Sequence, residues 1–360
     1  PVVIATGEKI KPEVDFQSLG LYGLGLKRTY RSKHAAGTLF GPQWLSSVDV
    51  PRLKEPNCGN TGTGRCIPRS VTVSAPTGST THYQFVGENE FPSPQDPRAK
   101  SYLYLSGKSA RSGEMVYTPG AGWTLWANGN TYTYNKVGAI VSIVEGAGAQ
   151  LNFQYGANPN QLASVSNSGG QLIQFTWGGN GKVSRVRDPA GNDWNYEYHA
   201  SGMLAKVTAP ASQEVREYHY ETANPVLLTG ISINGQRHGR YAYFADGRVS
   251  ESGLEGGEER ETFVYGANQT TVTDARQQVT THKFALIGGE LKPTSVSRAG
   301  TATCAAAAAS TAYDANGYVD YTLDWNGNKT DYSYDAGGRL LSQTTAAGTG
   351  AAQTVVHSWN

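Results

Sequence analysis

An aromatic residue recurs at a nearly fixed interval through the second half of this chain. Seven members of the series lie 21 to 23 residues apart: Tyr134, Tyr155, Trp177, Tyr198, Tyr220, Tyr243 and Tyr265. The interval is interrupted at Phe284 and Tyr313, and Tyr334 then follows 21 residues after Tyr313. A fixed period of about twenty residues is typical of repeat proteins, whose units bury apolar surface mainly against their neighbours. The period therefore predicts a repeated scaffold.

Turn residues follow the aromatic residues in a regular pattern. Six repeats place a glycine four residues after the aromatic residue and an aliphatic residue two positions later: Tyr134–Gly138–Ile140, Trp177–Gly181–Val183, Tyr198–Gly202–Leu204, Tyr243–Gly247–Val249, Tyr313–Gly317–Val319 and Tyr334–Gly338–Leu340. After Tyr313, the Asp314 side chain is expected to open a type I turn, and Gly317 to accept the positive φ that follows. Three further repeats have a longer turn: Tyr155 to Leu162, Tyr220 to Leu227 and Tyr265 to Val272.

The segments between these turns have the pattern of β-strands. Residues 193–198 and 331–334 alternate apolar and polar side chains, which is typical of half-buried strands. After the turns, aliphatic residues such as Leu204 and Val207 are three apart, a spacing that a flat strand does not place on one face. A bulge or a strong twist is therefore expected. No stretch of a dozen residues shows helical periodicity.

We therefore expect an all-β repeat architecture, with residues 120–345 forming one continuous antiparallel sheet. The aromatic period is absent from residues 1–119, which also contain the proline-rich stretch 91–97. These differences predict two parts, an N-terminal β domain at 1–119 and a repeat sheet at 120–360, with 88–100 as an exposed loop. The last residues have the pattern of a new strand without a closing element, so the sheet is expected to be truncated at its C-terminus.

The repeat resembles the YD repeat of the Rhs family, whose core is Tyr-Asp-x-x-Gly-x-Leu. Residues 334–340 match it at every defined position, and residues 313–319 match with Val in place of Leu. Linking Asp-x-x-Gly-Asn elements occur at 188–192 and 324–328. The N-terminus resembles the domain that opens such proteins, with motifs at 5–9, 15–16, 26–32 and 40–44 in the expected order. The resemblance covers roughly residues 1–345 and implies a sheet that spirals into a partial shell around a C-terminal toxin.

Composition is consistent with a non-membrane β scaffold. The chain has 360 residues, of which 16% are charged, below the usual quarter for soluble domains. Its 30 Lys and Arg nearly balance its 29 Asp and Glu, so no bulk attraction to nucleic acid is expected. No run of about twenty apolar residues is present, so no transmembrane segment is expected.

Cysteine placement gives a weak indication of the compartment. Cys58 and Cys66 enclose a Gly- and Thr-rich loop, for which a disulfide-closed hairpin is the favoured interpretation and two free thiols the alternative. Cys304 is expected to stay free. A disulfide would favour an oxidising destination, and with the family resemblance it predicts a secreted or cell-surface bacterial protein.

No pattern for catalysis, cofactor binding or metal binding emerges from the sequence. The seven His residues are scattered, and no four-ligand cluster adjoins the cysteines. The acidic stretch around Glu258 is expected to be a solvated loop, because paired-carboxylate hydrolysis needs a rigid cleft. The Gly-rich segment 178–182 lacks the phosphate-binding spacing. We therefore expect no enzyme activity, catalytic residue, cofactor or metal in this chain.

Two functions from different classes remain. The family resemblance implies a structural wall that encloses a C-terminal toxin of the same full-length protein. The alternative is a carbohydrate-binding or adhesion module, because Tyr and Trp rows on a β surface stack well on sugar rings. Secretion machinery and a cell-surface glycan are the further candidate partners. The same rings serve as cross-strand structural pairs in the wall hypothesis, so their burial distinguishes the two.

Overall fold

The computed structural model describes residues 1–17, 23–34, 39–54, 68–76, 79–89, 101–105, 113–118, 121–135, 137–210, 214–302 and 304–359. These residues form β-strands joined by turns, and no helix occurs among them. They divide into two compact units. The first unit comprises residues 10–228 and 232–236, and the second comprises 1–9, 229–231 and 237–360. The all-β fold expected from the sequence is confirmed.

Most of the first unit is one antiparallel ladder in which each strand pairs with the next along the chain. Its strands are β5 (Arg52–Lys54), β6 (Ser70–Ser74), β7 (Thr80–Asn89), β8 (Ser101–Leu105), β9 (Glu114–Thr118), β10 (Gly122–Ala127), β11 (Asn130–Tyr134), β12 (Ile140–Val144), β13 (Gln150–Tyr155), β14 (Leu162–Asn167), β15 (Leu172–Trp177), β16 (Val183–Arg187), β17 (Asp193–Tyr198), β18 (Leu204–Thr208) and β19 (Val215–His219). Pairing of β9 with β10 carries the ladder past residue 120 without interruption. The domain boundary at 119/120 stays a prediction.

The start of this ladder folds back on a later turn. The main-chain N–H of Leu53 on β5 donates to the carbonyl of Gly138, in the turn between β11 and β12, at 3.1 Å. Gly138 has a φ of 73°, and a Cβ at this position would collide with the carbonyl of Leu53. Glycine is therefore required here both by the turn and by the close approach of the β5 main chain.

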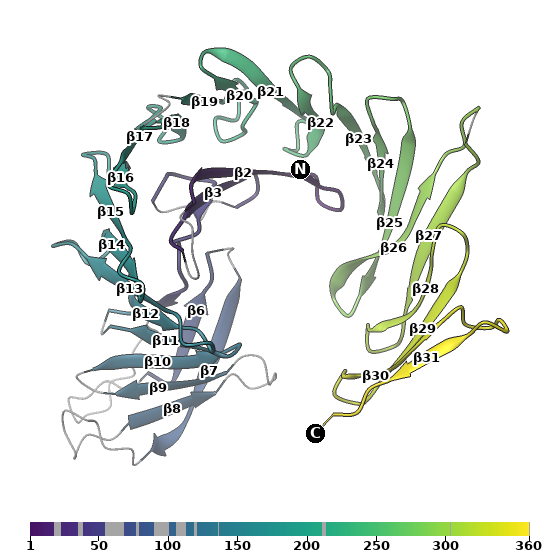
Figure 1. Ribbon diagram of the computed structural model, residues 1–360, viewed down its shortest axis with the longest axis horizontal. Helices are drawn as coiled ribbons and strands as arrows, with labels where there is room; N and C mark the ends of the chain where they lie inside the picture. The colour runs from purple at the N-terminus through teal and green to yellow at the C-terminus, as the bar shows by residue number, and fades with distance from the viewer. Residues whose placement is uncertain are drawn as a thin grey trace. The chain divides into compact units, whose positions relative to one another are not determined.

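A second, smaller sheet contains the N-terminal residues. It is formed by β1 (Val2–Val3), β2 (Glu8–Phe16), β3 (Leu26–Arg31) and β4 (Trp44–Ser46), paired antiparallel in that order. Figure 1 shows β2 and β3 of the first unit along the inner side of the strands that precede β20. Two layers of sheet thus bury the core of the first unit, as an antiparallel sheet with one covered face requires.

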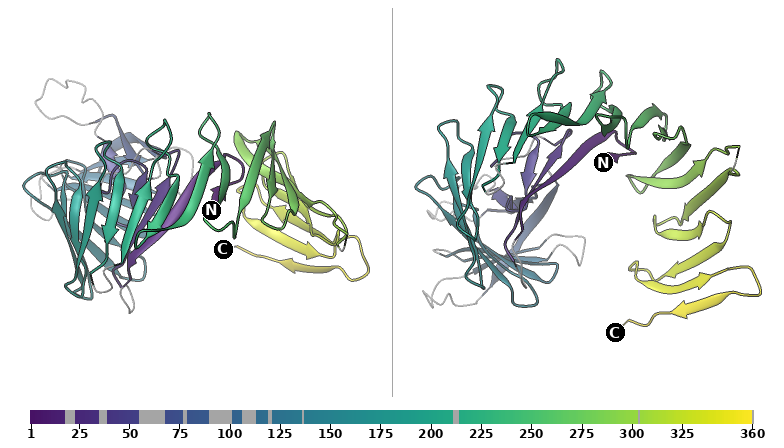
Figure 2. Two further views of the ribbon diagram at one scale, coloured as in Figure 1. Left: turned by 90° about the horizontal axis from the view of Figure 1, so that it is seen from above. Right: turned by 45° about the horizontal axis from the view of Figure 1, so that its top comes forward.

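The second unit continues the same hairpin pattern, seen as successive green to yellow hairpins in Figure 2. Its ladder contains β21 (Gln236–Tyr243), β22 (Val249–Leu254), β23 (Glu261–Gly266), β24 (Gln269–Thr273), β25 (Val279–Ile287), β26 (Glu290–Arg298), β27 (Ala307–Tyr313), β28 (Val319–Leu323), β29 (Lys329–Tyr334), β30 (Leu340–Thr345) and β31 (Gln353–Val356). Short β20 (Gly230–Ile233) contributes residues to both units.

Some sequence expectations fall on segments that the structure does not cover. Cys58 and Cys66 lie outside the described residues, as does residues 90–100 of the expected loop, whereas Glu88 and Asn89 belong to β7. Cys304 is exposed and has no disulfide partner among the described residues. No helix in the described segments has the length and apolar character needed to cross a bilayer.

Candidate functional site: repeated clasps and a buried N-terminal layer

The repeat aromatic residues occupy one defined position, the end of a strand where the pairing register shifts by one residue. On β17, Glu197 pairs with Lys206 but Tyr198 pairs with Leu204, so Ala205 is the extra residue of a β-bulge. Equivalent shifts occur at Tyr134, Tyr155, Trp177, Tyr243, Phe284, Tyr313 and Tyr334. The bulge places Leu204 and Val207 on the same buried face, which explains the spacing of three.

The turns beyond these bulges have the chemistry that the sequence predicts. Asp335 Oδ1 accepts hydrogen bonds from the main-chain N–H groups of Gly337 and Arg339, both at 2.9 Å. Asp314 does the same for Asn316 and Tyr318. The six repeat glycines have positive φ, from 73° to 83°: Gly138, Gly181, Gly202, Gly247, Gly317 and Gly338. The polar side chain and the glycine together fix each hairpin's connection.

A hydrogen bond links each of several aromatic residues to the preceding hairpin. Tyr198 Oη donates to the main-chain carbonyl of Val183 at 2.6 Å, and Val183 is the residue paired with Trp177. We call this bond the clasp: it joins a ring O–H or N–H to the carbonyl opposite the previous aromatic residue. Four more clasps have the same form: Trp177 to Leu162, Tyr265 to Val249, Tyr313 to Pro293 and Trp359 to Leu340, each 2.8 Å long.

Two clasp positions were missed in the sequence. Phe284 was assigned to an interruption of the period, yet it occupies the bulge position, and its partner Pro293 accepts the clasp from Tyr313. Trp359 lies 25 residues after Tyr334 and donates the last clasp. An aromatic residue followed by a hairpin-length gap was the available signal, but a strict interval excluded both residues.

Two of the three longer turns expected from the sequence differ in the structure. Tyr265 pairs with Thr270 and Val272 pairs with Phe263, so Tyr265 precedes a tight hairpin with Asn268 at a φ of 57°. Tyr220 follows the end of β19 instead of lying on a strand, and its hydroxyl accepts a bond from Trp44 Nε1 at 2.9 Å. Spacing alone does not distinguish these local geometries, because an Asn in left-handed conformation can replace glycine.

The aromatic rings of the repeat are partly covered. Tyr134 is fully buried, and its hydroxyl has no hydrogen-bond partner among the described residues, while Tyr155, Trp177, Tyr198, Tyr220, Tyr243, Tyr265, Tyr313 and Tyr334 are half-buried. Ring contact is present at Tyr334, which stacks on Tyr318 with centroids 5.1 Å apart. The recurrent contact is nevertheless the clasp.

Beneath the clasped strands of the first unit lies a buried charged cluster centred on Arg28. Its guanidinium donates to both carboxylate oxygens of Asp15, from Nε at 2.6 Å and from Nη2 at 2.7 Å. Nη2 also donates to the hydroxyl of Tyr218 on β19, and the hydroxyl of Tyr196 on β17 donates to Asp15. Arg28 and Asp15 side chains are both 0% exposed. The pair thus attaches the N-terminal layer to two strands of the repeat sheet.

The surroundings of this pair stabilise its charged form. The Arg28 guanidinium carbon lies 5.0 Å from the Trp44 ring centroid and 5.6 Å from that of Tyr218. Burial alone lowers the pKa of Arg28, but Asp15 and the surrounding tyrosines outweigh burial and raise it above its ordinary value. Burial raises the pKa of Tyr218 to about 12, against the opposing effect of Arg28. Buried pairs with such complete hydrogen bonding resist removal of either partner.

The second unit has its own, smaller N-terminal layer. Val2 and Ile4 pack on the buried cluster of Val249, Phe263 and Val272. Thr270 Oγ1 donates to the carbonyl of Ile4 at 2.8 Å, and the N–H of Val249 donates to the carbonyl of Gly7 at 3.0 Å. Residues 1–9 therefore cover β22 to β24.

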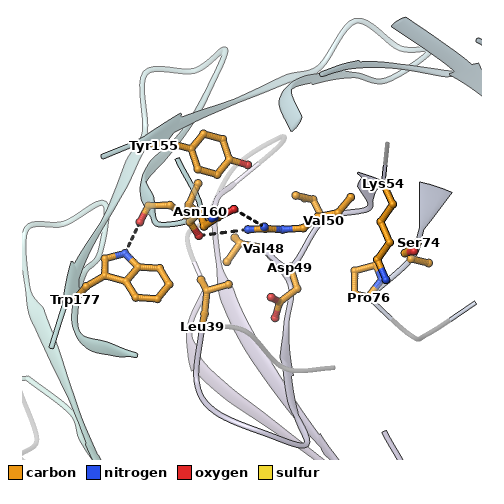
Figure 3. A pocket seen from close by; sticks show the side chains of 13 residues that line it. Leu39, Val48, Asp49, Val50, Lys54, Ser74, Pro76, Tyr155, Asn160 and Trp177 are labelled. Carbon is orange, nitrogen blue, oxygen red and sulfur yellow. Dashed lines mark hydrogen bonds between the residues drawn. The ribbon is translucent and has the colours of Figure 1, made fainter. Parts of the chain in front are cut away.

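A cavity of about 260 Å³ lies beside the Trp177 clasp in the first unit (Figure 3). Repeat residues Tyr155, Asn160 and Trp177 line it on one side, and residues of the 39–76 segment line it on the other. Arg52 donates to the side-chain and main-chain oxygens of Asn160, at 3.2 and 3.3 Å. No cluster of three or more His, Cys, Asp or Glu with metal-binding geometry occurs among the described residues.

Comparisons with known proteins match two parts of the chain. Residues 1–65 match the model of a domain of unknown function, DUF6531, and residues 126–281 match that of the Teneurin YD-shell. A curated relative, double-stranded DNA deaminase toxin A of Burkholderia cenocepacia (strain H111), is 25% identical over 170 residues, which are 47% of this chain and 12% of the relative.

Solved structures of toxin complexes are similar at low identity. A crystal structure of TcdB2-TccC3-TEV is 12% identical, with a TM-score of 0.43 over 80% of this chain and 19% of that one. A structure of the Photorhabdus luminescens Tc holotoxin pore is 12% identical, with a TM-score of 0.34 over 95% of this chain and 20% of that one. The chain thus spans a small part of each protein it resembles.

Proposed function

Because the chain belongs to the Rhs/YD-repeat proteins, we propose that it is a non-catalytic structural scaffold, part of a YD-repeat shell. The shell encloses and delivers a toxin domain that belongs to the same full-length protein and is not part of this chain. The relative named as a deaminase toxin, which this chain matches over a small part of its length, is consistent with such a cargo. A secreted or cell-surface location in a bacterium is part of this proposal.

The repeated clasp is the observation that carries the wall function. Each clasp ties a hairpin to its predecessor through a main-chain acceptor, from Leu162 in the first unit to Leu340 in the second. Hydrogen bonds within each ladder already join the strands, and the clasp adds one bond across each pair of hairpins on the inner face. Such repetition suits a continuous wall, whereas a catalytic centre needs a unique constellation of residues.

The same contacts weigh against the carbohydrate-binding alternative. A sugar-stacking ring needs an accessible face, and lectin-type sites also use polar hydrogens for sugar hydroxyls. Tyr198, Trp177 and Tyr265 are half-buried, and their polar hydrogens already bond main-chain carbonyls. A glycan array tests this directly: loss of binding in Tyr198→Ala at unchanged melting temperature would favour the recognition function.

The wall function is tested by protease protection in the full-length protein. An epitope placed in the segment that follows this chain should resist a protease concentration that removes an exposed terminal tag within minutes. The control is the same segment expressed alone, which should be digested rapidly. Digestion of the segment at equal rates in both proteins would contradict enclosure by the wall.

A further inference from the structure

The cavity beside the Trp177 clasp has an uneven distribution of charge and apolar surface. In Figure 3, Trp177 and Leu39 lie at one end, and Lys54 lies with Ser74 and Pro76 at the other. Arg52 crosses the middle, where it bonds to Asn160. The cavity therefore has an apolar end and a cationic end.

The cationic end has one net positive charge. Arg52 and Lys54 are two residues apart on β5, so their side chains leave the same face of the strand. Asp49 also lines the cavity, and its Oδ2 accepts bonds from the N–H and the hydroxyl of Ser46 at 2.6 and 2.8 Å. Two cations and one carboxylate leave a net charge of +1, which matches a monoanion.

Hydrogen-bond donors remain at this end. A guanidinium has five N–H donors, and the two bonds from Arg52 to Asn160 leave three of them for another acceptor. Ser74 pairs directly with Arg52 across β5 and β6, and its buried hydroxyl has no hydrogen-bond partner among the described residues. A surplus of donors without acceptors indicates a ligand group rich in acceptors, and a carboxylate supplies two acceptor oxygens.

The apolar end is held in place by the repeat. The indole N–H of Trp177 donates to the carbonyl of Leu162, which fixes the orientation of the ring. Leu39, Val48 and Leu162 beside it are buried, with exposed fractions of 5 to 7%. A ring or branched alkyl group is the chemistry that such a surface accepts.

We propose that this cavity is a binding site for an apolar group that carries one carboxylate. The carboxylate lies between Arg52, Lys54 and Ser74, and the apolar group lies against Trp177 and Leu39. Two sources supply this chemistry, the C-terminal residue of a polypeptide and a free small carboxylic acid. The site is independent of the proposed wall function, because it needs only the first unit.

The test compares an acid with its neutral amide. N-acetylphenylalanine and N-acetylphenylalanine amide are titrated into the full chain, and binding is followed by saturation-transfer NMR. For ligands of this size we expect a dissociation constant on the order of 1 mM for the acid. The amide should bind about tenfold more weakly or worse, because charge-assisted hydrogen bonds are roughly twice as strong as neutral ones. Equal binding of acid and amide, or binding of neither at 10-fold higher concentration than about 1 mM, would overturn the proposal.

Two variants locate the site. Lys54→Gln leaves the fold intact because Lys54 is exposed, and Arg52→Gln removes the central donor. Each should weaken binding of the acid about tenfold and leave binding of the amide unchanged. Lys283→Gln, an exposed lysine of β25, is the matched control and should change nothing. Circular dichroism and melting temperature confirm folding of each variant. If Lys54→Gln and Arg52→Gln bind the acid as the native chain does, the assignment is wrong.

A second pair of probes distinguishes the sources. A tripeptide that ends in phenylalanine is compared with indole-3-acetate, each with its amide. Acid-dependent binding of the tripeptide alone assigns the site to chain ends, and acid-dependent binding of indole-3-acetate alone assigns it to free carboxylic acids. Binding of both by the native chain, lost in Arg52→Gln, supports a site that recognises only the shared group.

Discussion

The second unit contains two stretches of one ladder that share the hairpin pattern but differ in burial. Beneath residues 1–9, β22 to β24 bury Val249, Phe263 and Val272, with exposed fractions of 0 to 7%. From β25 to β31, every strand residue is half-buried or exposed. Bulges and clasps continue through both stretches. The repeat therefore specifies a sheet, whereas a core forms only where a second layer covers that sheet.

The first unit follows the same rule with a larger cover. There the layer of β2 to β4 buries Trp44, Tyr30 and Arg28 completely against the repeat strands. The aromatic period is the same on either side of the difference in burial. The stability of a given repeat should therefore depend on its cover more than on its own sequence.

Breaking the buried pair should have the largest effect. Asp15→Ala leaves the Arg28 guanidinium buried without its counter-ion, which typically costs about 3–5 kcal/mol in the free energy of unfolding. Urea denaturation followed by tryptophan fluorescence measures the loss. Glu251→Ala is the control, because its ion pair with Arg260 is at the surface and such pairs contribute at most about 1 kcal/mol. Equal losses in the two variants would mean that the N-terminal layer does not stabilise the first unit.

Truncating matched aromatic residues compares the covered and uncovered stretches directly. Phe263→Ala, on β23, should destabilise the second unit by about 3–5 kcal/mol, because Phe263 is 1% exposed. Phe284→Ala, on the uncovered β25, should cost much less, because Phe284 is only half-buried. Thermal unfolding measured for both variants gives the difference. Similar losses would show that the uncovered stretch has a core of its own.

Removing one clasp should have a smaller effect. Tyr198→Phe deletes the hydrogen bond to Val183 and retains the ring, with an expected loss of about 0.5–1.5 kcal/mol. Hydrogen exchange should increase locally in β16 to β18. Tyr321→Phe is the control, since that ring contacts Lys329 and does not donate a clasp. If both variants behave alike, the clasp contributes no measurable stability.

High pH should produce the smallest of these effects. Burial raises the pKa of Tyr218 to about 12, above its value of about 10 in the unfolded chain. The folded state then retains a proton that the unfolded state has lost, so this contribution is present below about pH 10 and is lost as pH rises toward 12. Melting temperature should fall over this range, and Tyr218→Phe should reduce the fall. An unchanged slope in the variant would contradict the assignment.

Much of the fold could be predicted from the sequence because its signals are local. Alternation identified the strands, and Asp with Gly at fixed offsets identified turns such as Asp335 to Gly338. The spacing of Leu204 and Val207 required a bulge, and the bulge occurs at Tyr198. Each of these features is decided within one hairpin, where period and turn chemistry act directly.

The buried layer and the clasps could not be predicted, because they join residues far apart in the sequence. Asp15 and Arg28 were recognised as parts of N-terminal motifs, but nothing in either residue indicates contact with Tyr196 and Tyr218. The clasp acceptor is a main-chain carbonyl, which every residue has, so no side-chain pattern marks it. Trp359 was missed for this reason, since its interval alone did not match.

The main-chain acceptor of the clasp has a consequence for how such chains change. Leu162, Val183, Val249, Pro293 and Leu340 all accept a clasp, although they include three aliphatic types and a proline. The donor thus places no demand on the side chain of its neighbour. A hairpin can be duplicated, lost or exchanged with another without a compensating substitution in the hairpin beside it. The wall can therefore vary in length while the rule that joins its parts stays the same.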